Sequence, residues 1–176
     1  MRYRRANLPG ASYFFTVNLA ERKSRLLVEH VDVLRESVRH VKTAHPFVID
    51  AMVIMPDHLH ALWTLPDGDS DFSTRWGLVK SGFSRHIEAT ERISASRKTK
   101  GERGIWQRRF CEHFIRDDND FERHVDYIHY NPVKHGFVLR PVDWSLSSIH
   151  CYIKQHIIDE DWAGYDDLKQ TDFGEI

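Results

Sequence analysis

The sequence FVIDAMVIMPDHLHALWTL, residues 47–65, contains two strand-like segments and a turn. Residues 47–54 are apolar and rich in β-branched side chains, and residues 58–65 alternate between apolar and other residues. The three residues between them, MPD at 55–57, have the composition of a turn. Two such segments joined by a short turn are typical of paired antiparallel strands. We therefore predict a β-hairpin that ends at the turn sequence PDGD, residues 66–69.

Four further segments surround this hairpin in the order β-α-β-β-α-β. Residues 12–19 alternate in hydrophobicity and predict a strand, whereas residues 31–44 carry apolar residues every three or four positions, as amphipathic helices do. A second helix is predicted over residues 72–93, and residues 106–116 have the composition of a strand. The order is that of the split βαβ unit, so we predict an α+β, ferredoxin-like fold with an antiparallel sheet.

A third helix is predicted after the last strand. Asp117 and Asp118 can cap its N-terminus, its apolar positions continue to Ile128, and Pro132 should end or bend it. Residues 94–104, SASRKTKGERG, are polar and without periodicity, which predicts a mobile loop.

The composition is that of a globular protein. An apolar fraction of 41% in 176 residues suits one domain, which we assign to residues 1–148, with residues 149–176 as a tail packed on it. No apolar run approaches the roughly 18 residues needed to cross a bilayer, and the N-terminus does not read as a signal peptide, so we expect a cytoplasmic protein. Cys111 and Cys151 are far apart and are expected to be free thiols.

Positive charge is concentrated in one segment although the formal net charge is −1. Residues 73–109 contain ten Lys and Arg against three Glu, whereas residues 155–176 contain seven acids against Lys169. A basic stretch can neutralise phosphates and release counterions, which indicates an anionic partner. The alternative is an ordinary solvated helix face followed by an acidic tail.

His58 and His60 are separated by one residue, so a strand places both imidazoles on the same face. That spacing suits two ligands of one metal ion. The opposite face carries Leu59, Ala61 and Trp63 and should be the core side covered by helices, which leaves the histidines on the open face of the sheet. The alternative is a pair of partly exposed histidines that bind no metal.

Tyr127 and Asn131 lie four positions apart on the third predicted helix and therefore share one helical face. An isolated helical tyrosine is usually a packing or surface residue. A tyrosine that attacks a phosphodiester needs a metal or a cation to polarise the phosphate. This chemistry is possible only if the helix crosses the face of the sheet that carries the histidines.

Two motifs carry a resemblance to a known family. Residues 55–60, MPDHLH, look like the HUH motif of single-tyrosine transposases, where U is a bulky apolar residue. Residues 124–136, HVDYIHYNPVKHG, resemble the tyrosine helix of one branch, the bacterial REP-associated tyrosine transposases. The similarity extends from about residue 2 to residue 148. Two separated motifs in the right order are more specific than either motif alone.

The resemblance implies an enzyme that cuts and rejoins DNA. By it, His58, His60 and Asn131 bind Mg²⁺ or Mn²⁺, with Asn131 standing where relatives often use Gln. Tyr127 is the nucleophile that forms a covalent 5′-phosphotyrosine with single-stranded DNA. Tyr130 lies one turn away and is the competing candidate, but the motif favours Tyr127.

The resemblance also implies the partner, which is single-stranded DNA with a hairpin from a repetitive extragenic palindrome. No membrane and no small-molecule cofactor is expected. The short connection before the tyrosine helix favours a monomer whose tyrosine serves its own histidine pair. The candidate DNA contacts are the basic residues of the N-terminal arm and of the second helix, namely Arg2, Arg4, Arg5, Lys80, Arg85 and Arg92.

Two other functions fit parts of the sequence. A non-catalytic ferredoxin-like nucleic-acid-binding module would present aromatic residues to single strands, but it leaves the histidine pair unexplained. A metal-dependent phosphodiesterase would use activated water in place of Tyr127 and would release a free 5′-phosphate.

Overall fold

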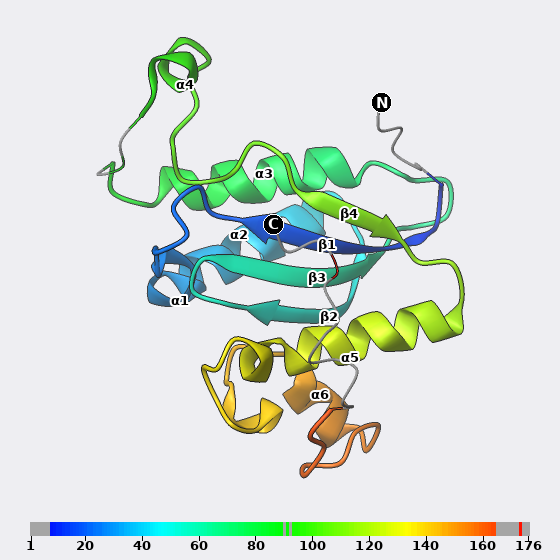
Figure 1. Ribbon diagram of the computed structural model, residues 1–176. Coiled ribbons are helices and arrows are strands. Elements are labelled where there is room, and N and C mark those ends of the chain that lie inside the picture. Colours follow the sequence, from blue (N-terminus) through cyan, green and yellow to red (C-terminus); the bar gives the residue numbers. More distant parts are fainter. Residues whose placement is uncertain (1–7, 90, 92, 165–172, 174–176) are drawn as a thin grey trace.

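The computed structural model describes residues 8–89, 91, 93–164 and 173. Four strands form one antiparallel sheet in the order β2-β3-β1-β4 (Figure 1). The strands are β1 (Ser12–Asn18), β2 (Val48–Ile54), β3 (His58–Thr64) and β4 (Cys111–Phe114). This order, with helices between β1 and β2 and between β3 and β4, confirms the predicted α+β, ferredoxin-like fold.

The central hairpin β2-β3 forms as predicted, and the backbone amide of Met55 closes its turn on the carbonyl of His58 at 2.9 Å. The last strand is shorter than predicted. Only Cys111–Phe114 pairs regularly with β1, while Trp106 forms an isolated bridge with Leu19. Between these two segments a side chain, and not the neighbouring strand, donates to a backbone carbonyl: the Lys80 ammonium donates to the carbonyl of Gln107 at 3.0 Å. Side-chain donors therefore replace part of the strand ladder.

Helices α2 (Val31–Ala44) and α3 (Phe72–Arg85) pack side by side on one face of the sheet, with the short helix α1 (Leu26–Glu29) before them. The second helix was predicted to extend to residue 93, but α3 ends at Arg85. There the Arg103 guanidinium donates to backbone carbonyls, including that of Ile87 at 2.6 Å, in place of further helical amides. Residues 94–104 are also not simply a loop. They contain helix α4 (Ala95–Thr99), which is capped by the Ser94 side chain.

Helix α5 (Asp118–Lys134) lies on the other face of the sheet and contacts β2 and β3 (Figure 1). Asp117 caps it as predicted, accepting from the amide of Asp120 at 2.8 Å. Pro132 does not end the helix, which continues to Lys134. The proline removes the hydrogen bond from position 132, but the amide of His135 still donates to the carbonyl of Asn131 at 3.0 Å, which continues the helical pattern past the proline.

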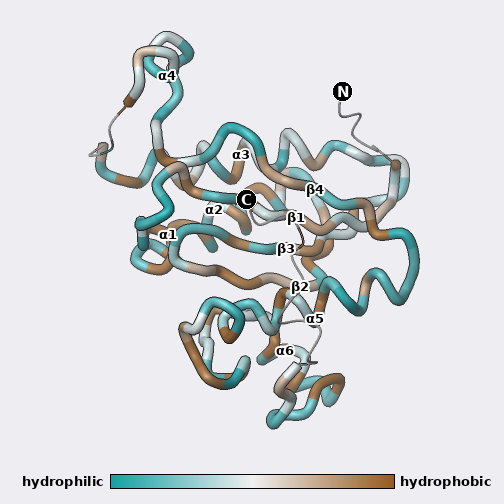
Figure 2. The backbone as a smooth tube through the Cα atoms, viewed as in Figure 1, coloured by the Kyte–Doolittle hydropathy of each residue, from teal (hydrophilic) through white to brown (hydrophobic). Residues whose placement is uncertain are grey.

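The chain after α5 forms the 3-10 helix η1 (Pro141–Asp143) and helix α6 (Ile149–Lys154). The Trp144 indole donates to the carbonyl of Ile54 at 3.0 Å and ties this segment to the end of β2. Figure 2 shows apolar residues along the strands and hydrophilic residues on the first turns of α5. Within the described part of the chain, no helix has both the length and the apolarity to cross a membrane. Cys111 and Cys151 are free thiols.

Candidate active site

The histidine pair lies on β3 and is buried, with relative exposures of 1% for His58 and 0% for His60. Their ring centroids are 5.0 Å apart, so one strand face presents both imidazoles together, as the alternation predicted. The expectation of an open sheet face was wrong. Helix α5 covers that face and forms a second apolar cluster with it, which includes Phe14, Leu62 and Ile128.

Neighbouring oxygens fix the orientation of both rings. Nδ1 of His58 lies 2.8 Å from the Asp57 carboxylate, and Nδ1 of His60 lies 3.0 Å from the Thr16 hydroxyl. Nε2 of His58 is buried and has no hydrogen-bond partner among residues 8–89, 91, 93–164 and 173. A buried imidazole nitrogen with a lone pair can coordinate a metal ion. Hydrogen bonds at the other ring nitrogen, like those at Nδ1 here, commonly orient histidines that bind metals.

Asp57 connects the histidine pair to the surface. Its carboxylate also pairs with Arg22, whose Nε lies 3.0 Å away. Burial alone would raise the pKa of Asp57, but the hydrogen bond with His58 and the positive charge of Arg22 lower the pKa below its usual value. Asp57 is therefore ionised at neutral pH and holds Nδ1 of His58 as a donor.

Tyr127 and Asn131 come to this face from α5, and both are fully buried. The ring of Tyr127 lies 5.3 Å from the ring of His60, with Phe14 packed edge-on at 6.0 Å. The competing Tyr130 packs instead against Gly164, where an added Cβ would lie 2.5 Å from its ring. The helix thus crosses the histidine face in the way that the chemistry requires.

Three residues of the site were not predicted. Nζ of Lys134 donates to Oη of Tyr127 at 3.1 Å, and the ring of His135 lies 5.1 Å from that of His58. Both residues belong to the HVDYIHYNPVKHG motif, which was the available signal. Phe173, far along the chain, packs edge-on against Tyr127 at 4.9 Å, and no sequence pattern indicated this contact.

A second polar group lies beside the histidine pair. His113 on β4 and Asp120 and His124 on α5 place possible ligand atoms within 4.8 Å of one another. The Asp120 carboxylate is already used, because it accepts from Nε2 of His113 at 2.9 Å and from the Arg116 guanidinium at 3.2 Å. Although burial would raise the pKa of Asp120, these hydrogen bonds lower it strongly. The group joins β4 to the first turns of α5 and so orients the tyrosine helix.

The predicted DNA contacts are not gathered at the histidines. Lys80 and Arg85 lie on α3, in the helix layer that covers the opposite face of the sheet. Lys80 is half-buried against the rings of Trp106 and Phe110, whereas Arg85 is exposed. The four remaining candidates, Arg2, Arg4, Arg5 and Arg92, lie outside the described residues.

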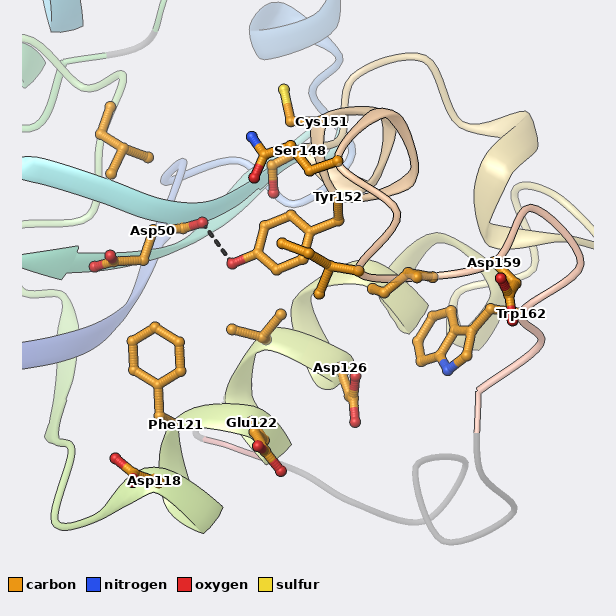
Figure 3. A pocket seen from close by; sticks show the side chains of 15 residues that line it. Asp50, Asp118, Phe121, Glu122, Asp126, Ser148, Cys151, Tyr152, Asp159 and Trp162 are labelled. Carbon is orange, nitrogen blue, oxygen red and sulfur yellow. Dashed lines mark hydrogen bonds between the residues drawn. The ribbon is translucent and has the colours of Figure 1, made fainter.

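A cavity of about 1090 Å³ lies on the outer side of α5, between α5, α6 and the edge strand β2 (Figure 3). The described residues that line it include no Lys or Arg but do include acids such as Asp50, Glu122 and Asp126. Tyr152 donates to the carbonyl of Asp50 at 2.8 Å, and burial raises the pKa of Tyr152 to about 12. An acidic wall repels phosphates and so disfavours DNA in this cavity, and the raised pKa disfavours the Tyr152 phenolate.

Comparisons with known proteins agree with this geometry. Residues 9–131 match the family described as "Transposase IS200 like". A ferredoxin-like sheet with an HxH pair facing a helical tyrosine is the arrangement that the sequence motifs predicted for this class, although not its burial. The chain belongs to the IS200-like family of single-tyrosine transposases, which are enzymes that nick and rejoin DNA.

The relatives define the branch of that family. A REP-associated tyrosine transposase of Escherichia coli K12 is 43% identical over 162 residues, which cover 92% of this chain and 90% of the relative. A Haemophilus influenzae relative, whose assigned name also includes REP-associated tyrosine transposase, is 42% identical over 168 residues, 95% of this chain and 96% of its own length. A solved structure of a REP-associated tyrosine transposase bound to a REP hairpin has a TM-score of 0.83 at 42% identity, covering 98% of this chain and 94% of that one. The chain thus belongs to the REP-associated branch of this family, as the resemblance predicted.

Proposed function

We propose that this transposase is a metal-dependent endonuclease and strand transferase that acts on single-stranded DNA through a covalent 5′-phosphotyrosine at Tyr127. The observation that carries the proposal is the position of Tyr127 on the buried histidine face, 5.3 Å from His60 between ring centroids. Tyr130 lacks this position because it packs against Gly164. Tyr127 and His60 meet within one chain, which supports a cis active site; the proposal keeps the monomer expected from the sequence.

His58, His60 and Asn131 would hold the metal ion. The donor set fits, because Nε2 of His58 is buried without a hydrogen bond from the described residues and the Asn131 side-chain oxygen is also buried. Two imidazoles and one amide oxygen leave positions open for phosphate oxygens, and the proposal keeps both Mg²⁺ and Mn²⁺ as candidate ions. When bound, such an ion supplies a Lewis acid for a phosphate oxygen.

The side chains of this protein supply the remaining chemistry. Oη of Tyr127 forms a bond to phosphorus while the bond from phosphorus to the 3′-oxygen breaks, which leaves a free 3′-hydroxyl. The reverse attack by a 3′-hydroxyl on the phosphotyrosine rejoins DNA without an external energy source. Tyr127 is buried between α5 and the sheet, which disfavours attack of water on the phosphotyrosine, so strand transfer should prevail over hydrolysis.

The DNA partner is proposed from the relatives. The similar solved structure is that of a transposase bound to a REP hairpin, and the chain covers nearly all of it. We propose that this chain also binds a hairpin of a repetitive extragenic palindrome and cuts in flanking single strand. The N-terminal arm with Arg2, Arg4 and Arg5 remains a candidate contact, since its charge suits phosphates.

The test is the covalent product. The unaltered protein, Tyr127→Phe and the matched control Tyr130→Phe are incubated with a labelled hairpin oligonucleotide and Mn²⁺, then separated on a denaturing gel. We expect a slow covalent band with the unaltered protein and with Tyr130→Phe, and no band with Tyr127→Phe. Free cleavage products with all three proteins would indicate water as the nucleophile. Retention on native gels without any cleavage would indicate a binding module.

A further inference from the structure

Lys134 occupies a position next to the reacting atom of the proposed nucleophile. Its Nζ lies 3.1 Å from Oη of Tyr127 and 4.8 Å from the centroid of the tyrosine ring. The two residues are seven positions apart, about two turns of α5, so one face of the helix carries both. The contact is a hydrogen bond from an ammonium group to a fully buried phenol oxygen.

This position matters because charge develops on that oxygen. In cleavage Oη of Tyr127 attacks as an electron-rich oxygen, and in rejoining it leaves phosphorus with a negative charge. A buried oxygen cannot rely on water to stabilise that charge, so a fixed cation at hydrogen-bond distance is worth more there than at the surface. Arg22 and Arg116 pair with the carboxylates of Asp57 and Asp120, whereas Nζ of Lys134 lies at hydrogen-bond distance from Oη of Tyr127.

We propose that Lys134 is a catalytic residue that stabilises negative charge on Oη of Tyr127 in both cleavage and rejoining. The inference rests on the proposed function of Tyr127 as the nucleophile. In cleavage Oη of Tyr127 loses its proton as its bond to phosphorus forms, the bond from phosphorus to the 3′-oxygen breaks, and the 3′-oxygen gains a proton, so that no net proton is consumed. Lys134 keeps its charge throughout. Rejoining reverses each of these changes, with Lys134 beside the departing phenolate.

Three variants separate charge, hydrogen bonding and packing. Lys134→Met removes both the charge and the donor, Lys134→Gln keeps a donor without charge, and Lys134→Arg keeps the charge. The rate of covalent product formation is measured in a single turnover with Mn²⁺ and saturating hairpin oligonucleotide. Because loss of one charge-stabilising donor typically costs about 100-fold to 1000-fold, we expect that loss for Met and Gln and a much smaller one for Arg. The exposed Lys154→Met on α6 is the matched control and should be unchanged.

A sulfur substrate distinguishes the oxygen on which Lys134 acts. An oligonucleotide with sulfur in place of the bridging 3′-oxygen has a leaving group that needs no proton. If Lys134 acts on Oη of Tyr127, Lys134→Met stays slow on this substrate and also rejoins slowly. Full recovery of the Met variant on sulfur would overturn the proposal, because Lys134 would then serve the leaving 3′-oxygen.

The remaining outcomes separate the two proposals. A covalent product that forms at the same rate in Lys134→Met overturns the role of Lys134 and leaves the role of Tyr127 intact. Absence of any Tyr127-dependent covalent product with the unaltered protein overturns both. Native gels with the same oligonucleotide should show equal hairpin binding for all variants. A rate loss that merely follows weaker hairpin binding would therefore contradict the proposal.

Discussion

The two faces of the sheet use the same strands for different purposes. Alternate residues of β1 and β3 point to one face, where Tyr13, Phe15 and Trp63 pack under α2 and α3. The residues between them, including Thr16, His58 and His60, point to the other face under α5. Both faces are buried, but among the described strand residues only the second face buries polar side chains, namely Thr16, Asn18, His58 and His60. The first face supplies stability, and the second holds polar side chains in a site from which water is excluded.

This difference has an energetic cost that the apolar face offsets. A buried polar group without a partner costs about 1 to 3 kcal/mol, and Nε2 of His58 is such an atom within the described residues. The stacked rings of Trp63 and Trp76, with centroids 4.0 Å apart, lie on the apolar face. Their indole nitrogens are also buried without a partner among the described residues, but the apolar area that the two rings bury outweighs that cost. Removing residues from each face should therefore give opposite patterns of stability and activity.

The largest effect is expected on the polar face, in His60→Ala. Loss of a proposed metal ligand removes several kcal/mol of transition-state stabilisation, so the rate of covalent product formation should fall at least about 1000-fold. The rate is measured in a single turnover with hairpin oligonucleotide and Mn²⁺, and the fold is checked by circular dichroism. A folded variant that keeps metal-dependent cleavage within tenfold of the unaltered rate would show that His60 is not a ligand.

The apolar face should respond in stability. Trp63→Ala removes a fully buried ring and should lower the free energy of unfolding by about 3 to 5 kcal/mol, because the cavity cannot collapse between Phe47 and Trp76. Urea denaturation measures the change. Leu139→Ala is the matched control, since Leu139 is 93% exposed and should leave the urea midpoint unchanged. Equal midpoints for Trp63→Ala and the control would contradict the role assigned to this face.

The contrast between the two faces explains what the sequence could predict. The hairpin over residues 47–65 and the amphipathic helix at 31–44 follow from local periodicity, and the structure confirms both. The ends of α3 and β4 do not follow from local periodicity, because the side chains of Arg103 and Lys80 donate hydrogen bonds to backbone carbonyls of distant segments. Such contacts depend on the finished tertiary structure, which a single-sequence pattern does not contain.

The candidate site was predicted in part for the same reason. Strand and helix periods place His58 with His60 and Tyr127 with Asn131, and the structure brings these two pairs to one face. Periodicity could not show that α5 covers this face, so the histidines were expected to be open. It also gave no reason to place Lys134 at the oxygen of Tyr127, because side-chain direction at a helix end depends on packing.

Low pH should lower the stability of the protein through a buried histidine of α5. His129 on α5 is fully buried beside Tyr152 and Ser148, and burial lowers its pKa from the usual 6.5 to about 3. Above pH 6.5 both folded and unfolded chains are neutral at this residue. As the pH falls below 6.5, the unfolded chain binds a proton and the folded chain does not, so stability should fall by about 3 kcal/mol by pH 4.

The matched variant for this effect is His129→Gln, which keeps a donor for Ser148 and cannot titrate. Urea denaturation between pH 7.5 and pH 4 should show a shallower loss of stability in this variant than in the unaltered protein. Some loss should remain, because burial also lowers the pKa of His124. Identical pH dependence in the two proteins would mean that His129 is protonated in the folded state without penalty.

The smallest effect is expected from Asp57→Asn. This substitution alters the side chain that orients His58 and removes no proposed metal ligand. The Asp57 carboxylate lies 2.8 Å from Nδ1 of His58 and fixes the orientation of the ring. An amide keeps the shape and loses the charge, so the Mn²⁺ concentration for half-maximal cleavage should rise about 10-fold to 100-fold. The fully exposed carboxylate of Asp32 on α2 provides the matched control Asp32→Asn, which should need no additional metal. Equal Mn²⁺ requirements in both variants would show that Asp57 does not affect metal binding. Its pairing with Arg22 would then be a purely structural contact.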